Sequence, residues 1–150
     1  MKHSYTTYFA EIYDEVMKNV PYKYWFRYLK DLLKYYKHQP ESVLELASGT
    51  ANMTLKLINL QSINRITALD LSSAMISKAA EKLEYKIKNS QEFNGFSAAE
   101  DRMRYQVQKN KQQIAVNFTA QDMADFSFEH KFDLIVSFFD SLNYLTDIDQ

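Results

Sequence analysis

Four segments of the sequence carry small or acidic residues that could bind a polar ligand. In the first, Glu45-Leu46-Ala47-Ser48-Gly49-Thr50-Ala51, small residues would let a ligand approach the main chain closely, and Gly49 can adopt a positive φ that other residues resist. Asp70 lies twenty-five residues after Glu45, where a carboxylate can accept hydrogen bonds from both hydroxyls of a ribose. The other two segments are Gln121-Asp122-Met123 and Phe139-Asp140-Ser141-Leu142-Asn143-Tyr144.

Each of these segments stands at the end of a predicted β-strand. The strands are predicted at Ser42–Ala47, Arg65–Asp70, Ile114–Thr119 and Phe132–Phe139, and apolar residues at helical spacing predict helices after the first two. Strands that alternate with helices predict a parallel sheet, in which ligands lie beyond the carboxyl ends of the strands. We therefore expect the four segments to meet at one edge of the sheet.

Two amphipathic helices are predicted before the first strand. The first runs from Phe9 to Val20 and is ended or redirected by Pro21, and the second runs from Trp25 to Tyr36. The interval from Glu84 to Gln113 is predicted to be a mostly helical surface excursion, because its apolar positions are sparse and its charges are mixed. Within it, Ser97-Ala98-Ala99-Glu100 matches a capping box, which favours a helix there.

The composition favours a single domain with a small, uncharged partner. The 18 basic and 19 acidic residues give a net charge of −1, so no overall field would hold the chain on nucleic acid or an anionic membrane. There is no cysteine, and His3, His38 and His130 stand apart from one another, so we expect no metal site. No apolar run reaches the length of a membrane span, and the expected location is the cytoplasm.

In their order and spacing, these segments resemble class I S-adenosylmethionine (SAM) dependent methyltransferases of the small-molecule type. The matching segments are Val43–Ala51 for the first motif, Leu69–Met75 for the second, and Gln121–Phe126 with Lys131–Ile135 for the third and the approach to the fourth. Phe9–Asp14 and Tyr22–Trp25 resemble the helical lid that precedes the fold in many bacterial members.

The resemblance implies a Rossmann-like α/β fold with SAM as cofactor and a small-molecule methyl acceptor. Residues 1–40 would form the lid, and residues 41–150 would form a SAM-binding core that holds the first four strands of a seven-stranded sheet. The fold would then be incomplete at the C-terminus. Its fourth strand would lie at an open edge, through which the chain could self-associate.

The resemblance also implies roles for single residues. Asp70 would bind the ribose, Asp122 the adenine amino group, and the Met123 amide a ring nitrogen, while Glu45 would hold the methionine ammonium and Tyr13 would close over the cofactor. The full predicted cofactor-binding set is Tyr13, Glu45, Ala47, Ser48, Gly49, Asp70, Leu71, Asp122 and Met123. No catalytic residue is assigned, because methyl transfer needs mainly positioning. Asp140 or Tyr144 could take up a proton if the acceptor must lose one.

Two other functions stay open. A NAD(P)-dependent oxidoreductase would need Gly-x-Gly-x-x-Gly, and the corresponding positions are Ala47, Gly49 and Asn52. A non-catalytic remnant or interaction module could keep the same fold without turnover. Three of the site residues also have structural alternatives, since Asp70 could cap a helix, Asp122 could begin a turn, and Tyr13 could pack in the core from an apolar helix face. For Trp25 we expect packing rather than ligand binding.

Overall fold

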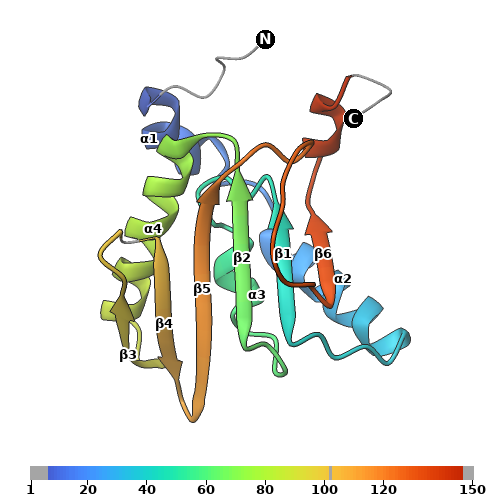
Figure 1. Ribbon diagram of the computed structural model, residues 1–150, viewed down its shortest axis with the longest axis vertical. Coiled ribbons are helices and arrows are strands. Elements are labelled where there is room, and N and C mark those ends of the chain that lie inside the picture. The colour runs from blue at the N-terminus through green and yellow to red at the C-terminus, as the bar shows by residue number, and fades with distance from the viewer. Residues whose placement is uncertain (1–6, 102, 147–150) are drawn as a thin grey trace.

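A computed structural model describes residues 7–101 and 103–146, which form a six-stranded sheet with helices packed against it (Figure 1). The strand order is β3-β4-β5-β2-β1-β6. The strands are β1 (Ser42–Leu46), β2 (Arg65–Asp70), β3 (Phe93–Ala98), β4 (Arg104–Lys109), β5 (Gln112–Ala120) and β6 (Leu134–Ser137). The four strands β5, β2, β1 and β6 are parallel, as predicted, and the α/β fold class is confirmed.

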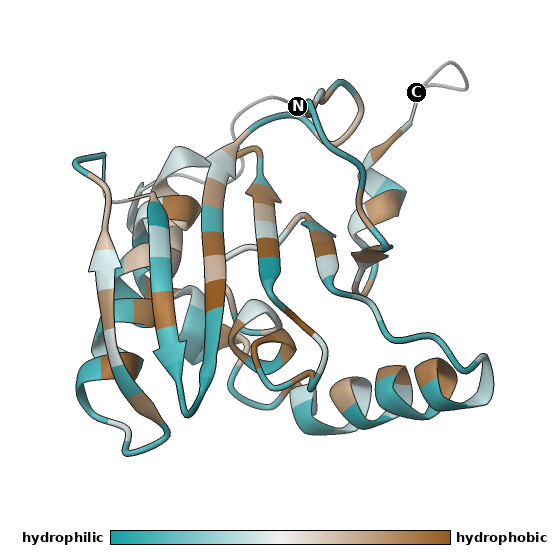
Figure 2. Cartoon of the chain, turned by 60° about the horizontal axis from the view of Figure 1, so that its bottom comes forward, coloured by the Kyte–Doolittle hydropathy of each residue, from teal (hydrophilic) through white to brown (hydrophobic). Residues whose placement is uncertain are grey.

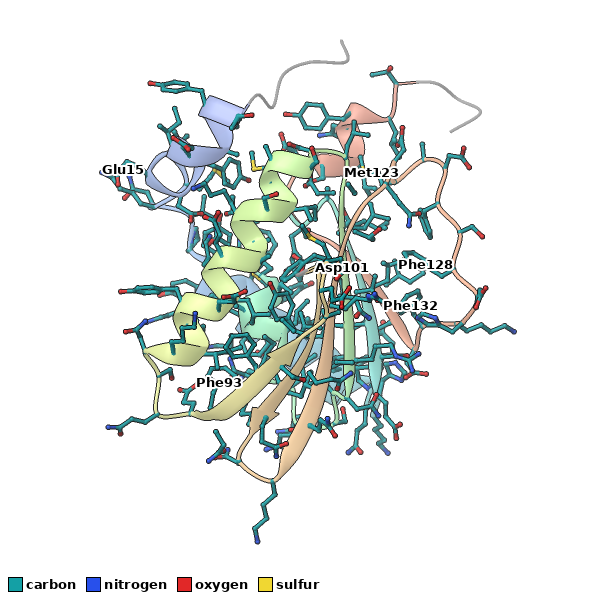
Figure 3. All side chains as sticks on the ribbon, turned by 60° about the vertical axis from the view of Figure 1, so that its left-hand side comes forward. Glu15, Phe93, Asp101, Met123, Phe128 and Phe132 are labelled. Carbon is teal, nitrogen blue, oxygen red and sulfur yellow. The ribbon has the colours of Figure 1, made fainter. Side chains whose placement is uncertain are left out.

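The helices lie mainly on one face of this sheet. They are α1 (Thr7–Val16), α2 (Tyr22–Tyr35), α3 (Thr54–Leu57), α4 (Ser73–Lys88) and the short 3-10 helix η1 (Ser141–Tyr144). Figures 1 and 3 together show α2, α3 and α4 on one side and the segment between β5 and β6 on the other. Pro21 directly precedes α2 and separates it from α1, as predicted. No helix in the two described ranges is long and apolar enough to cross a membrane.

The core lies between the helices and the central strands. The four inner positions of β2 are all buried, as expected for a parallel strand flanked on both sides. Along β5 buried positions alternate with more exposed ones, and Figure 2 shows this alternation as bands of opposite hydropathy. The largest completely buried aliphatic side chains are Leu44, Leu57, Ile58, Ile63, Ile66, Leu69, Leu83 and Ile114.

The segment between α4 and β5 is a β-hairpin, and the helix predicted there was wrong. Strand β3 pairs antiparallel with β4, and β4 pairs antiparallel with β5. Tyr105 and Val107, two positions apart, are both completely buried, which is the period of a strand. The capping-box match at Ser97 to Glu100 reports only a local preference for a helix start. The conformation is decided instead by burial of Tyr105 and Val107 against α4 and β5. Arg102 lies outside the described residues.

The strand predicted from Phe132 to Phe139 is shorter than expected and lies at an edge of the sheet. It has β1 as its only neighbour in the described part of the chain, and Ile135 is 55% exposed while Val136 is buried. The expectation for His3 falls outside the described residues. Residues 147–150 also lie outside the described residues.

The hairpin gives a first testable prediction. Replacing Tyr105, whose hydroxyl donates to Glu84 Oε1 at 3.1 Å, by Ala should lower the free energy of unfolding by about 3–5 kcal/mol, because it empties a large core volume. Gln106→Ala, on the exposed side of the same strand, should change it by no more than about 0.5 kcal/mol. Urea unfolding would measure both, and equal effects would contradict the packing of the hairpin on the core.

Candidate functional site

The turn that follows β1 has an unusual main-chain conformation. Its φ angles are 53° at Ala47, 55° at Gly49 and 68° at Ala51, and two of these three residues are not glycine. Residues other than glycine seldom adopt positive φ, and such strain gathers at functional sites. The turn is held to the end of β2, because the Ser48 N–H donates to the Leu69 carbonyl at 2.9 Å. We call residues 47–51 the glycine turn.

Asp70, the last residue of β2, accepts hydrogen bonds from two neighbouring turns. Its Oδ2 accepts from the Gly49 N–H at 2.8 Å, and its Oδ1 accepts from the Ser72 N–H at 2.9 Å. Burial raises the pKa of Asp70, and these two hydrogen bonds lower it less than burial raises it. The cap of α4 is Ser72, whose Oγ accepts from the Met75 N–H at 3.3 Å, so Asp70 is not that cap. Each Asp70 oxygen keeps acceptor capacity for a ligand.

Glu45 is a carboxyl group that is almost completely buried beneath the glycine turn. It is 2% exposed, and its Oε2 accepts a hydrogen bond from Thr54 Oγ1 in α3 at 2.5 Å. Burial, together with the nearby charge of Asp70, raises the pKa of Glu45 to about 8. The hydrogen bond from Thr54 lowers this pKa, but by less. No cation of the described residues lies within ion-pair distance of it. A ligand cation would therefore provide the charge partner that Glu45 lacks.

A cavity of about 80 Å³ opens at the carboxyl edge of the sheet. It is lined by Tyr13, Met17, Tyr22, Glu45, Ala47, Ser48, Asn52, Met53, Phe138, Phe139, Asp140, Ser141 and Tyr144. The Ser48 hydroxyl is buried at this cavity without a hydrogen-bond partner among the described residues, which leaves it suited to a polar ligand group.

Tyr13 closes this cavity on the side of α1. Its ring lies 3.5 Å from the position that a Cβ on Gly49 would occupy, which is ordinary van der Waals contact, so the ring packs over the glycine turn. Burial, followed by the charges of neighbouring Tyr22 and Asp70, raises the pKa of Tyr13 to about 12, so the phenol stays protonated at neutral pH. Pockets for organic ligands commonly enclose about 300–1,000 Å³. A nucleoside-sized ligand therefore requires this cavity to open further than it does here.

The cavity brings together six of the residues predicted from the sequence. They are Tyr13, Glu45, Ala47 and Ser48 from the predicted cofactor set and the two proton-acceptor candidates Asp140 and Tyr144. Gly49 and Asp70 lie next to it, joined to each other by a hydrogen bond. Leu71, which follows Asp70, is 66% exposed.

Asp122 and Met123 do not line this cavity. Asp122 Oδ1 accepts from the Ala124 N–H at 2.9 Å, so its side chain begins a turn, which was its structural alternative. The preceding residue, Gln121, donates its N–H to the Asp70 carbonyl at 3.0 Å, which keeps this segment beside β2. Figure 3 labels Met123 at the same end of the molecule as α1 and η1.

Several residues of the site were not predicted from the sequence. Phe139 has a φ of 64°, and its ring contacts Tyr22 and Trp25 edge-on at centroid distances of 5.5 and 5.7 Å. Trp25, for which packing was expected, is 40% exposed even with this contact. Met17 could have been found, because it lies one helical turn after Tyr13. The contact between α2 and the end of β6 joins distant segments and has no local signal.

Four parallel strands in the order β5-β2-β1-β6, with a small-residue turn after β1 and an acidic residue closing β2, are typical of the class I methyltransferase fold. A model of the ubiE/COQ5 methyltransferase family matches residues 3–141, and the chain belongs to that family. The resemblance read from the sequence is thereby confirmed.

Individual relatives agree with this assignment. The Bacillus subtilis (strain 168) protein "Putative methyltransferase YqeM" is 30% identical over 140 residues, which cover 91% of this chain and 42% of that protein. The crystal structure of an S-adenosylmethionine-dependent methyltransferase from Clostridium acetobutylicum ATCC 824 has a TM-score of 0.65 and 26% identity, covering 93% of this chain and 46% of that one. Streptomyces venezuelae DesVI, at 20% identity and a TM-score of 0.64, shares the fold over 93% of this chain and 47% of its own. The chain thus spans less than half the length of these relatives.

Glu45 gives a prediction about the pH dependence of stability. Between its ordinary pKa of 4.5 and its folded value of about 8, the folded chain holds a proton that the unfolded chain releases. The free energy of unfolding should therefore fall by roughly 1 kcal/mol per pH unit from this group as the pH rises through that window. Glu45→Gln should remove that slope, whereas Glu129→Gln, at an exposed loop position, should keep it. Urea unfolding at several pH values would measure it, and an unchanged slope in Glu45→Gln would exclude the buried neutral carboxyl.

Proposed function

We propose that this chain binds SAM at the carboxyl edge of the sheet and presents its methyl group to a small-molecule acceptor. Family membership and the named activity of the Clostridium acetobutylicum structure support the choice of cofactor. The observation that carries the proposal is the buried Glu45 carboxyl, which lies beneath a strained turn of small residues and has no cationic partner among the described residues. The SAM amino acid moiety supplies an ammonium group of the required charge.

The remaining residues fit the other parts of such a cofactor. The free acceptor capacity of Asp70 suits ribose hydroxyls, and the unpaired Ser48 hydroxyl suits the polar amino acid end. Asp122 and Met123 are proposed for the adenine, because they follow β5, the strand next to β2. In this proposal residues 1–40 act as a lid over a core that begins at residue 41, with Tyr13 as the part that meets the cofactor.

When bound, SAM supplies a methyl group that is already activated on a sulfonium. The chain then needs to orient the cofactor and keep water out. The aromatic rings of Tyr13, Tyr22, Phe138, Phe139 and Tyr144 line the cavity and would exclude water from it. If the acceptor loses a proton, Asp140 or Tyr144 lies on the cavity wall to accept it.

The small-molecule acceptor is proposed from the charge and shape of the site. The chain is close to neutral, which disfavours a polyanionic acceptor. The cavity is walled by aromatic rings on several elements rather than lying on an open face, which favours a compact ligand.

Replacing Asp70 by Ala tests cofactor binding directly. Calorimetry should show the Kd for S-adenosylhomocysteine (SAH) rising roughly 5- to 150-fold, the effect of about 1–3 kcal/mol from lost charged hydrogen bonds. Asp133→Ala is the matched control, because Asp133 accepts from the Glu41 and Ser42 N–H groups at the start of β1 and so joins β6 to β1 at the opposite end of the strands. This control should lower the melting temperature and leave SAH affinity unchanged.

The same experiment separates the alternatives. Tighter binding of NAD than of SAH by the unmodified chain would favour the oxidoreductase. Equal SAH affinity in the Asp70→Ala and unmodified chains would remove Asp70 from the site.

We also propose that two copies of the chain associate through the edge of β6 that has no strand partner among the described residues. Strands with an unpaired edge and exposed apolar side chains readily pair with another chain. Ile135 is 55% exposed on this strand. Sedimentation should show association that increases with concentration and is weakened by Ile135→Lys. Tyr85→Lys, which replaces a 70% exposed aromatic residue on α4, should not weaken it. A monomer at all concentrations would contradict the proposal.

A further inference from the structure

A polar cluster beside the cavity joins α1, the glycine turn and α4. Lys82 of α4 forms an ion pair with Asp14 of α1, with Nζ 2.5 Å from Oδ2. The same ammonium donates to Thr50 Oγ1 and Asn52 Oδ1, both at 2.9 Å. Asp14 Oδ1 in turn accepts from Thr50 Oγ1 at 2.6 Å and from Asn52 Nδ2 at 3.0 Å. We call these four residues the clasp.

The clasp is more buried and makes more hydrogen bonds than an ordinary surface ion pair. The Lys82 side chain is 23% exposed, the Asp14 side chain is 47% exposed, and Thr50 is only 1% exposed. Burial raises the pKa of Asp14, but hydrogen bonds from Lys82, Thr50 and Asn52 outweigh it and hold the pKa below its ordinary value. Isolated exposed pairs contribute little, whereas a charge held by several hydrogen bonds has a defined geometry.

The clasp also determines where Tyr13 lies. Asp14 and Tyr13 are adjacent in α1, so their side chains leave the helix in different directions. Tyr13 lies over Gly49, while Asp14 is bound to Thr50 and, through Lys82, to α4. Asn52 extends the connection to α2, because its Nδ2 donates to the Tyr22 hydroxyl at 3.2 Å. Fixing Asp14 therefore fixes the ring that covers the glycine turn.

We infer that Lys82 is a positioning residue that, through Asp14, holds Tyr13 closed over the bound cofactor. Lys82 is not among the residues that line the cavity, so it has no role in the proposed contacts with the ligand. Because the Tyr13 ring lies over the glycine turn, a weaker clasp would let a bound cofactor leave faster. This inference rests on the proposed SAM site.

The first test replaces Lys82 by Met, which keeps most of the side-chain length but removes the charge. The SAH Kd should rise about tenfold, mainly through faster dissociation, as expected for loss of charged hydrogen bonds. Lys82→Arg should restore most of the affinity, because a guanidinium can still bind the Asp14 carboxylate. Lys78→Met is the matched control, since Lys78 stands one turn earlier on α4 and also faces α1, at 4.0 Å from Glu11, without touching the glycine turn. Its SAH affinity should be unchanged.

A double-mutant cycle distinguishes positioning from a general loss of stability. In a Tyr13→Ala background, Lys82→Met should cause no further loss of SAH affinity, because the ring it positions is gone. A full additional tenfold loss in that background would overturn the inference.

Hydrogen exchange supplies a readout that needs no ligand. In the SAH-free chain, Lys82→Met should speed amide exchange in Thr7–Val16 while the strand amides of β1 and β2 keep theirs. Unchanged exchange in α1, or normal SAH affinity in Lys82→Met, would overturn the inference and leave the proposed function intact. Failure of the unmodified chain to bind SAH would instead overturn the proposed function.

Discussion

The hydrogen bond from the Gly49 N–H to the Asp70 carboxylate is the contact on which the site depends. It joins the turn after β1 to the end of β2, two strands that are adjacent and parallel in the sheet. The bond requires Gly49 to point its N–H toward β2, and it forms in a turn whose φ is positive at Ala47, Gly49 and Ala51. The strain of that turn persists because the buried sheet beneath it over-determines its position.

The same contact explains why so many contacts of the chain meet at one place. Gly49 contacts the Tyr13 ring on one side of the turn. On the other side, Thr50 and Asn52 bind Asp14 and Lys82. Movement of the glycine turn would therefore disturb the cavity wall and the attachment of α1 together. A rigid turn with a movable cover is a suitable arrangement for a ligand that must be enclosed and later released.

The sequence predicted those parts of the molecule that have a local signal. Short β-favouring segments that end in small or acidic residues gave the four parallel strands and the glycine turn, and helical spacing gave α1, α2 and α4. The hairpin of β3 and β4 was missed, because the alternation of Tyr105 and Val107 covers only a few residues and competed with a capping-box match. The clasp was missed for a different reason. Asp14, Thr50 and Lys82 are 36 and 32 residues apart, and nothing in the sequence marks which lysine of α4 faces α1.

Glu45 and Asp14 are two carboxyl groups of the site that differ in their charge and hydrogen-bond partners. Asp14 has a cation, two further donors and partial access to water, so its charge is satisfied within the chain. Glu45 has one hydroxyl donor and almost no access to water, so its charge is unfavourable until something else enters the cavity. The paired carboxylate therefore maintains the structure, and the unpaired one is free to respond to a ligand. Asp14 is part of the clasp that holds the glycine turn in place, and Glu45 lies beneath that turn. A cation bound in the cavity would therefore stabilise Glu45 beneath the same turn that the clasp holds.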